Sequence, residues 1–517
     1  MLNLSVFLDD SAREVPDRPA VIRGDAVWSY AAVDAAANQL ANALVAAGVE
    51  PGQRVALSCP NLEWFPIAYY GTLKAGGVVV PLNVLLKPRE IAYHLRDSDA
   101  VAYLCFGGTP DLPLGAMGHE GFAQVDSCHT FVLLPADLGS PSPIDGVPTA
   151  LEFVAGQPSR FDTVATSAED TAVILYTSGT TGQPKGAELT HANMVLNARL
   201  CDRLYPTTGP DVHLVTLPLF HSFGQSVQMN AGFYTGSTLV LLPRFTPVEA
   251  LQLMQQHQVT VFAGVPTMYW AMLGVDEQQL AGIDLAAVAD RLRIAVSGGS
   301  AMPLEVLRNF GERYGVQVLE GYGLSETSPV ATFNRLDRPA KPGSVGLPVW
   351  GVSVRVVDAD DNDLPTGEPG EVVVKGHNVM KGYLGRPEAT ATALRGGWFH
   401  TGDIGTFDED GFLSITDRVK DMIVRGGFNV YPREVEEVLM THPAVSLAAV
   451  LGVPDDRLGE EVKAFVVLVP GAEVTADELV AWSKQQMADY KYPRRIAFLD
   501  ELPMNATGKI LKRELRA

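Results

Sequence analysis

Short apolar runs alternate with helical patterns through about the first four hundred residues of this 517-residue chain. The run RVALSCP is followed by EWFPIAYYGTLKAG and then by GVVVPLN, which predicts a strand, a helix and a second strand. This order is typical of parallel sheets joined by crossover helices. Because domains average roughly 100 to 200 residues, the length predicts two to four folded units and a large buried core.

The pattern changes twice in the remaining part of the chain. Between about residues 343 and 411, short strands with close turn signals, as in VSVRVVDADDNDLPTGEPGEVVVKG, predict a small antiparallel, barrel-like unit. After DGFLSITDRVKD we predict a helix from about Pro432, the strands VSLAAVLGV and KAFVVLVP, and the helix TADELVAWSKQQM. The fold class is therefore α/β, with a large domain over residues 1–417 and a small α+β domain over residues 418–517.

Charge is distributed unevenly between these two predicted domains. The chain has a formal net charge of -21, yet residues 418–517 contain 14 basic and 15 acidic residues. Nearly all of the net negative charge thus belongs to the large domain. Nucleic-acid binding needs a basic surface that neutralises phosphates, so nucleic acid is not an expected partner.

The amino-terminus and the cysteines favour a cytoplasmic protein. No basic region precedes the first short apolar run, which ends at Asp9 and Asp10, so a signal peptide is not predicted. The apolar stretches are too short, or too interrupted by Gly and Pro, to span a bilayer as a helix of about 20 residues. The scattered Cys59, Cys105 and Cys128, with Cys201, form no CxxC pair and predict neither a zinc site nor disulfides. A peripheral membrane contact stays open.

A loop of small and hydroxyl-bearing residues follows the apolar run AVILY at residues 172–176. Hydroxyls, unhindered backbone N–H groups and one cation are what a polyphosphate needs. A Walker loop is disfavoured, because glycine and not Ser or Thr follows the lysine. A polyphosphate site outside the P-loop class is therefore predicted. The loop consists of Thr177, Ser178, Gly179, Thr180, Thr181, Gly182, Gln183, Pro184, Lys185 and Gly186.

This loop resembles the phosphate-binding signature of the acyl-adenylate-forming superfamily, which includes acyl-CoA synthetases, nonribosomal peptide adenylation domains and firefly luciferase. The resemblance covers nearly the whole chain, because the other family motifs follow in order, and together they are highly specific. They are LPLFH at 217–221, GYGLSET at 321–327, TGD at 401–403, DRVKDMIVRGGFNVYPREVE at 417–436 and PMNATGKILKREL at 503–515. The resemblance implies ATP-dependent, Mg²⁺-assisted ligation of a carboxylic acid to coenzyme A through an acyl-AMP, as in long-chain-fatty-acid–CoA ligases.

The resemblance also implies a nucleotide and metal site. Tyr322 offers an aromatic face to adenine, Glu326 a hard carboxylate to Mg²⁺ beside Thr177, and Asp403 an acceptor to the ribose hydroxyls. The residues implied around ATP or AMP are Thr177, Ser178, Gly179, Thr180, Thr181, Gly182, Lys185, Glu320, Gly321, Tyr322, Gly323, Ser325, Asp403, Arg418 and Lys509.

Lys509 resembles the family's adenylation lysine. A cation is needed at the α-phosphate, because both substrates are anionic and negative charge grows as pyrophosphate leaves. The implied catalytic residues are thus Lys509, Glu326 and Thr177. The resemblance further implies a mobile carboxyl-terminal domain that rotates about Lys420 and presents Gly426 and Gly427 to the pantetheine arm of CoA.

The expected acyl site is small and apolar. Its predicted residues are Phe220, His221, Gly298, Gly299, Gly323, Pro329 and Val330, and the segment Phe262 to Trp270 is expected to form another wall. An amino-acid substrate is disfavoured, because no acid follows His221 through Ser226 to pair an ammonium group. A medium- or long-chain fatty acid is our first choice, and an aryl acid such as a cinnamate or benzoate is the alternative.

Other classes of function fit less well. A P-loop phosphotransferase would need a Walker lysine–serine pair, and a non-catalytic nucleotide-binding protein would be expected to have lost Lys509, Glu326 or Asp403. A luciferase-like oxygenase uses the same motifs and stays open. A homodimeric assembly also stays open.

Overall fold

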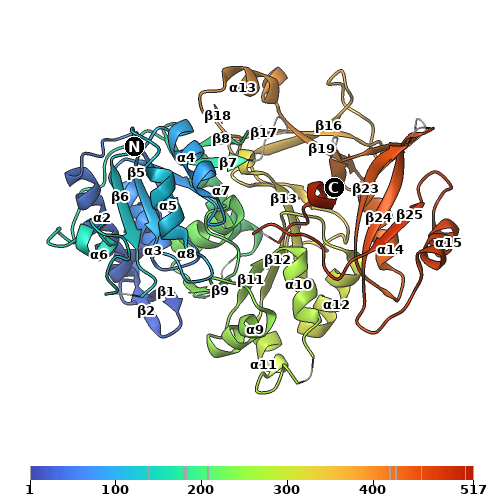
Figure 1. Ribbon diagram of the computed structural model, residues 1–517, viewed down its shortest axis with the longest axis horizontal. Coiled ribbons are helices and arrows are strands. Elements are labelled where there is room, and N and C mark those ends of the chain that lie inside the picture. Colours follow the sequence, from blue (N-terminus) through green and yellow to red (C-terminus); the bar gives the residue numbers. More distant parts are fainter. Residues whose placement is uncertain are drawn as a thin grey trace.

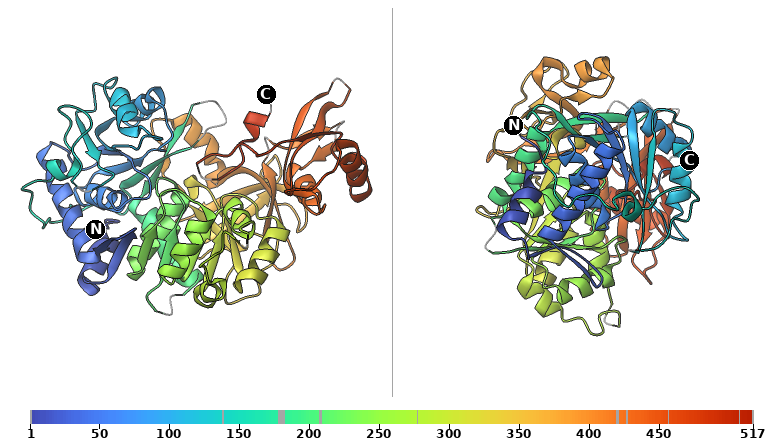
Figure 2. Two further views of the ribbon diagram at one scale, coloured as in Figure 1. Left: turned by 60° about the horizontal axis from the view of Figure 1, so that its bottom comes forward. Right: turned by 90° about the vertical axis from the view of Figure 1, so that its left-hand side faces the viewer.

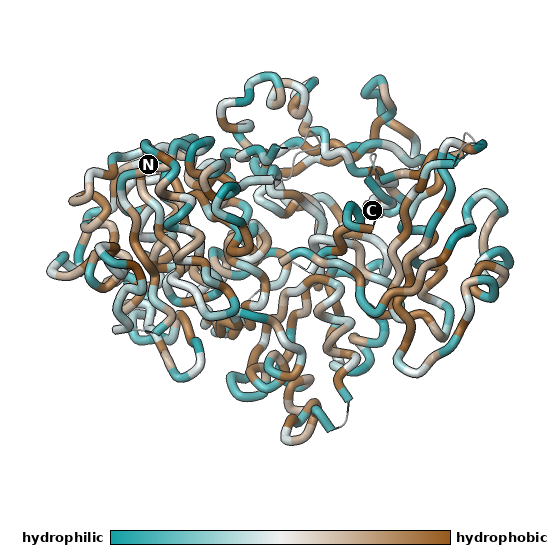
Figure 3. Tube along the Cα trace, viewed as in Figure 1, coloured by the Kyte–Doolittle hydropathy of each residue, from teal (hydrophilic) through white to brown (hydrophobic). Residues whose placement is uncertain are grey.

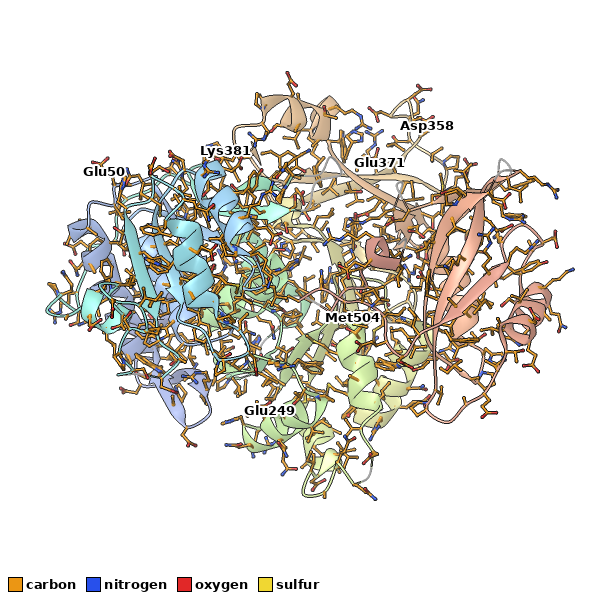
Figure 4. All side chains as sticks on the ribbon, in the orientation of Figure 1. Glu50, Glu249, Asp358, Glu371, Lys381 and Met504 are labelled. Carbon is orange, nitrogen blue, oxygen red and sulfur yellow. The ribbon has the colours of Figure 1, made fainter. Side chains whose placement is uncertain are left out.

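The computed structural model describes residues 2–137, 139–177, 183–206, 209–276, 278–418, 421–425, 428–455, 457–506 and 508–515. Figure 1 shows a large body built on two main sheets, with the last hundred residues forming a smaller unit at the right. The carboxyl-terminal segment then returns toward the middle of the molecule, where Figure 4 labels Met504.

The first large sheet has nine strands in the order β15-β14-β13-β12-β11-β9-β10-β1-β2. The strands from β13 to β1 are paired in parallel, and antiparallel pairs with β14, β15 and β2 close the two edges. Its strands are β1 (Pro19–Arg23), β2 (Ala26–Ser29), β9 (Val212–Val215), β10 (Thr238–Leu241), β11 (Val261–Gly264), β12 (Ile294–Ser297), β13 (Val318–Gly323), β14 (Val330–Phe333) and β15 (Leu347–Pro348).

The second large sheet has seven strands in the order β18-β8-β7-β4-β3-β5-β6. Strands β7 and β8 pair antiparallel, unlike the parallel pairs from β7 to β6, because the short loop between them leaves no room for a crossover helix. Its strands are β3 (Arg54–Ser58), β4 (Val78–Pro81), β5 (Ala100–Phe106), β6 (Thr130–Leu134), β7 (Thr171–Thr177), β8 (Lys185–Thr190) and β18 (Gly382–Tyr383).

Helices pack around both sheets (Figures 1 and 2). The α-helices of the large body are α1 (Val6–Glu14), α2 (Tyr30–Ala46), α3 (Trp64–Lys74), α4 (Pro88–Asp97), α5 (Leu114–Phe122), α6 (Ala150–Phe153), α7 (His191–Leu204), α8 (Ala231–Thr235), α9 (Pro247–Gln256), α10 (Pro266–Leu273), α11 (Leu285–Arg291), α12 (Leu304–Tyr314) and α13 (Pro387–Ala393). It also contains the π-helix η1 (Gly224–Asn230) and the 3-10 helices η2 (Ser325–Thr327) and η3 (Arg395–Gly397).

The predicted strand, helix and second strand are confirmed as β3, α3 and β4. Every residue of α3 is buried, and β4 is buried along its full length, as expected of parallel strands covered on both faces. In Figure 3 the hydrophobic stretches of the chain gather along the strands of the two large sheets. One hydrophobic core covers the seven-stranded sheet together with β1, β9 and β10 of the nine-stranded sheet, and a second covers the rest of the nine-stranded sheet and the antiparallel sheet that follows.

A four-stranded antiparallel sheet follows, in the order β16-β17-β19-β20, where the turn-rich sequence predicted one. Its strands are β16 (Val352–Val357), β17 (Gly370–Gly376), β19 (Phe399–Phe407) and β20 (Leu413–Arg418). Because β20 ends at Arg418, this sheet extends one residue beyond the predicted boundary between 417 and 418, which stays a proposal.

The last hundred residues form the expected α+β unit. Its sheet has the order β22-β21-β24-β23, with β25 parallel to β24. The elements are β21 (Ile423–Arg425), β22 (Phe428–Val430), α14 (Pro432–Met440), β23 (Val445–Asp455), β24 (Gly459–Leu468), α15 (Ala476–Gln486), β25 (Arg495–Phe498) and η4 (Lys512–Leu515). Helix α14 begins at Pro432, as predicted.

Among the described residues, no helix is both long and apolar enough to cross a membrane.

A buried lysine connects the first two helices to α3. The side chain of Lys74 is 2% exposed, and its ammonium contacts the carboxylates of Asp9 on α1 and Asp34 on α2, the latter at 2.6 Å. Taking a cation out of water is costly unless it is paired, and the two carboxylates offset that cost for Lys74. The ion pairs therefore fix α1 and α2 against the end of α3.

We expect Lys74→Met to lower the free energy of unfolding by about 3 kcal/mol, because it leaves two carboxylates without their shared cation. Arg13→Met is the control. It removes an exposed pair with Asp10 and should cost less than about 0.5 kcal/mol. Denaturant unfolding measures both values, and equal losses would contradict the buried ion pairs as the cause.

Candidate active site

The predicted site residues come together from separate parts of the fold. They lie at the end of β7 and the start of β8, on β13 and the following η2, at the paired ends of β19 and β20, and on the carboxyl-terminal segment that returns to the middle of the molecule (Figure 1). In sequence these segments span more than three hundred residues.

Glu326 is held between β7 and β18. The hydroxyl of Thr177 donates to its Oε1 at 3.1 Å, and the hydroxyl of Tyr383 donates to the same oxygen at 3.0 Å. The glutamate is only 7% exposed, and its backbone carbonyl accepts from the N–H of Met380. Burial and the neighbouring Glu326 charge raise the pKa of Tyr383, so this phenol stays a donor.

These contacts suit a magnesium ion that is also bound by phosphates. Both hydrogen bonds reach Oε1, and no described residue donates to Oε2 of Glu326. No cluster of three or more His, Cys, Asp or Glu side chains that could hold a metal occurs within the described ranges. Proteins commonly bind Mg²⁺ through one or two carboxylates together with substrate phosphates. Glu326 and Thr177 fit that arrangement.

Tyr322, Asp403 and Arg418 form a second group. The Tyr322 hydroxyl donates to Oδ2 of Asp403 at 2.7 Å, and Nε of Arg418 lies 3.1 Å from Oδ1. Asp403 faces Arg418 across the β19–β20 pair, which brings the two together. Burial, followed by the Asp403 charge, raises the pKa of Tyr322 well above its ordinary value. An aromatic ring, a carboxylate and a guanidinium thus lie together, as a nucleoside site requires.

Two glycines of the GYG segment lie where no side chain fits. A Cβ at Gly323 would lie 1.7 Å from the carbonyl oxygen of Pro329, and one at Gly321 would lie 2.5 Å from the Phe333 ring. The strand β13 bulges between Tyr322 and Gly323, where it pairs with β14. The close approach shapes the backbone on which Tyr322 is presented.

The Glu320 carboxyl is buried, and neighbouring groups act on its pKa. Burial raises its pKa to about 7, opposed by Arg433 and by the N–H groups of Met302 and Gly343. Its Oε2 has no hydrogen-bond partner. The role of Glu320 at the nucleotide stays a prediction. Ser325 begins η2, directly before Glu326.

The charge of Lys509 acts on His221. This charge contributes, after burial, to lowering the pKa of His221 to about 4, so the imidazole is neutral at ordinary pH. The preceding Gly508 has φ +75° and accepts a hydrogen bond at its carbonyl from the hydroxyl of Thr267, at 3.0 Å. A Cβ at Gly508 would approach Thr267 and Val265 to 2.8 Å. The carboxyl-terminal segment is thus docked against the start of α10.

The predicted acyl residues lie around the LPLFH segment and the end of β12. Phe220 is 9% exposed, Pro329 and Val330 are buried, and Gly298 packs so closely on the Phe223 ring that a Cβ would lie 3.2 Å from it. Gly299 is exposed, with φ +81°. Apart from His221, none of these predicted residues carries an ionisable side chain.

Only part of the segment Phe262 to Trp270, which was predicted to form a wall of the acyl site, lies against the turn that precedes Lys509. Val265 and Thr267 contact the Gly508 turn, whereas Phe262 is fully buried in the core and Trp270 is 36% exposed on the far side of α10. Phe262 lies on β11 and Trp270 on α10, so the run crosses from a strand into a helix, which a continuous apolar sequence does not reveal.

Several contributing residues were not predicted. Tyr383 holds Glu326, and Phe223 covers Gly298. Thr267 belongs to the predicted wall segment, but its hydrogen bond to the Gly508 carbonyl was not predicted. Nothing in their local sequence distinguishes them, because their partners are distant in the chain.

Other predicted residues lie outside the described ranges. They are Ser178, Gly179, Thr180, Thr181, Gly182, Lys420, Gly426 and Gly427. Their described neighbours are ordered as strands. Thr177 pairs with Lys185 across the β7–β8 hairpin, and Arg425 pairs with Phe428 across β21 and β22. Lys185 also places its ammonium 5.1 Å from the centre of the Tyr383 ring.

Comparison with known proteins shows the family of this chain. Residues 8–384 match the model of the AMP-binding enzyme family, and residues 434–509 match the AMP-binding enzyme C-terminal domain. A long-chain-fatty-acid–CoA ligase of Bacillus subtilis (strain 168) is 38% identical, with 99% of this chain and 94% of the relative covered. A feruloyl-CoA synthase of an Amycolatopsis species is also 38% identical, with 98% and 96% covered.

Solved structures agree with this family. The crystal structure of the anthranilate CoA ligase AuaEII in complex with anthranoyl-AMP has a TM-score of 0.91 and 29% identity, covering 99% of this chain and 96% of that one. The chain therefore belongs to the AMP-binding enzyme family, within the acyl-adenylate-forming superfamily, and is an AMP-forming acid–CoA ligase.

Proposed function

We propose that this ligase activates a medium- or long-chain fatty acid and transfers it to coenzyme A. The observation that supports this choice is that the segments on either side of His221 contain no ionisable side chain. They are Phe220, Ser222, Phe223 and the π-helix η1, whose residues are all buried. Since a buried charge needs a partner, these segments disfavour amino acids and acids with a second carboxylate, and favour an apolar tail.

The proposed reaction needs no protein nucleophile. A carboxylate oxygen of the acid attacks the α-phosphorus of ATP, and the bond to pyrophosphate breaks as the acyl-AMP bond forms. The sulfur of CoA then attacks the acyl carbon and AMP leaves. Lys509 would stabilise the charge that grows on the α-phosphate, and Tyr322, Asp403 and Arg418 would hold the nucleoside. Mg²⁺ bound by Glu326 and Thr177 would offset the charge of the phosphates.

We further propose that residues 418–517 rotate between the two half-reactions. The hydrogen bond of Thr267 to Gly508 and the effect of the Lys509 charge on His221 support the proposal that this arrangement serves adenylate formation. Rotation about Lys420 would withdraw Lys509 and bring Gly426 and Gly427 to the site for CoA.

An aryl acid is the second candidate, and a specific contact favours it. The flat Phe223 ring lies against Gly298, and the buried hydroxyl of Ser222, 1% exposed, has no hydrogen-bond partner. A ring substituent with a hydroxyl or ether oxygen would satisfy that hydroxyl.

Release of AMP with acids of graded chain length and with cinnamates and benzoates, each with and without CoA, tests the choice between these substrates. We expect the highest kcat/KM with acids of about eight carbons or more, because each buried CH₂ adds about 0.8 kcal/mol of binding. A preference for hydroxylated cinnamates would favour the aryl acid, and turnover only with amino acids would contradict both.

Lys509→Ala should reduce acid-dependent pyrophosphate exchange by about a hundredfold or more, because one preorganised charge at the transition state is worth that much. Preformed acyl-AMP should still react with CoA. Lys512→Ala, which removes a lysine paired with Glu436 at 2.8 Å, is the matched control in the same segment. Equal loss in both half-reactions after Lys509→Ala would overturn the proposed rotation.

His221 should contact substrate without transferring a proton. Its pKa of about 4 lies below the ordinary value, so the ring is uncharged at all pH values above about 5. Between pH 5.5 and 8 we expect adenylation by wild type and by His221→Asn to have the same pH profile, with a higher KM for the acid in the variant. Loss in the variant of a limb centred near pH 6 would show that His221 titrates in the reaction.

A further inference from the structure

Helix α4 contacts both ends of the hairpin that carries the proposed phosphate loop. The hydroxyl of Tyr93 donates to the backbone carbonyl of Pro184, near the carboxyl-terminal end of the loop, at 2.8 Å. One turn later, Oδ2 of Asp97 accepts from the hydroxyl of Tyr176, just before the loop, at 2.9 Å. Figure 1 shows α4 beside the strands β7 and β8.

Asp97 is an unexpected residue at its position. It is the last residue of α4, where the helix dipole disfavours a negative charge. Its side chain is nevertheless only 11% exposed, and its other oxygen, Oδ1, pairs with the guanidinium of Arg386 at 2.5 Å. A locally unfavourable, largely buried carboxylate with two partners indicates a role in tertiary contacts.

The contacts of β7 alternate between its two faces. Tyr176 points toward α4, where its ring also packs edge-on against the His94 ring with centroids 4.5 Å apart. The next residue, Thr177, points the other way and donates to Glu326. Since adjacent residues of a strand face opposite sides, α4 and the proposed metal carboxylate hold the same strand end from both sides.

We propose that Tyr93 and Asp97 are positioning residues that hold the two ends of the phosphate loop in the geometry that binds ATP. They touch the loop ends and not the substrate. The inference rests on the proposed role of the loop of residues 177–185 in holding the ATP phosphates. It assigns α4 a function that none of the sequence motifs suggests.

Binding of the magnesium complex of an α,β-methylene analogue of ATP, compared with binding of AMP, tests this inference by calorimetry on the full chain. AMP lacks the outer phosphates, so a misplaced loop should weaken the analogue alone. We expect Tyr93→Phe and Asp97→Asn each to weaken the analogue by about three- to tenfold, the effect of one lost hydrogen bond, with AMP affinity changed by less than about twofold.

Two matched controls separate this effect from general destabilisation. Tyr103→Phe removes a buried phenol on β5 that donates to Ser58 at 2.7 Å, and Asp99→Asn removes a carboxylate paired with Arg54 at 2.6 Å. Both should bind the analogue and AMP as wild type does. If Asp97→Asn fails to fold, Tyr176→Phe removes the same hydrogen bond while keeping the Asp97–Arg386 pair, and should give the same selective loss.

Wild-type analogue affinity in Tyr93→Phe and in either Asp97→Asn or Tyr176→Phe would overturn the inference. So would parallel losses of analogue and AMP affinity. The measurement contains no acid, so it is independent of which carboxylic acid the enzyme uses. Failure of wild type itself to bind the analogue would instead contradict the proposed role of the loop.

Discussion

The carboxylate of Glu326 joins three parts of the chain that are far apart in sequence. Thr177 ends a strand of the second large sheet, Glu326 follows a strand of the first, and Tyr383 belongs to the short edge strand beside β8. A buried carboxylate is stable only where donors or cations surround it. The two hydroxyls meet that need on one oxygen, at the place where the two sheets meet and where we propose that a cation and phosphates bind.

Much of the architecture follows from local sequence pattern. The strands β3 and β4, the buried helix α3, the antiparallel sheet after residue 350 and the start of α14 at Pro432 were all predictable, because apolar periodicity, turn residues and proline act over a few positions. The antiparallel β7–β8 hairpin was not predicted. A strand's own pattern does not specify the direction of its neighbour, and here the short loop decides it.

The site was predictable where a motif carries the chemistry and unpredictable where tertiary contacts supply it. Tyr322, Asp403 and Arg418 lie together, and the charge of Lys509 acts on His221, in agreement with the motif resemblance. Tyr383, Thr267, Tyr93 and Asp97 belong to no recognised motif, because each acts on a residue that is remote in the chain. Glu320 shows a further limit: its carboxyl is buried and burial raises its pKa to about 7, which its place next to the GYG segment does not reveal.

The contact between Thr267 and Gly508 has a consequence for the speed of the catalytic cycle. It is a neutral hydrogen bond, made by one hydroxyl to one backbone carbonyl, and such a bond has a net worth of about 0.5–1.5 kcal/mol. In the proposed rotation, a contact of that strength would shift the balance between docked and withdrawn arrangements by about tenfold at most, and it would slow release of the Lys509 turn very little. A stronger, ionic contact at this point would hold the adenylate-forming arrangement after the acyl-AMP is complete and would delay binding of the CoA thiol.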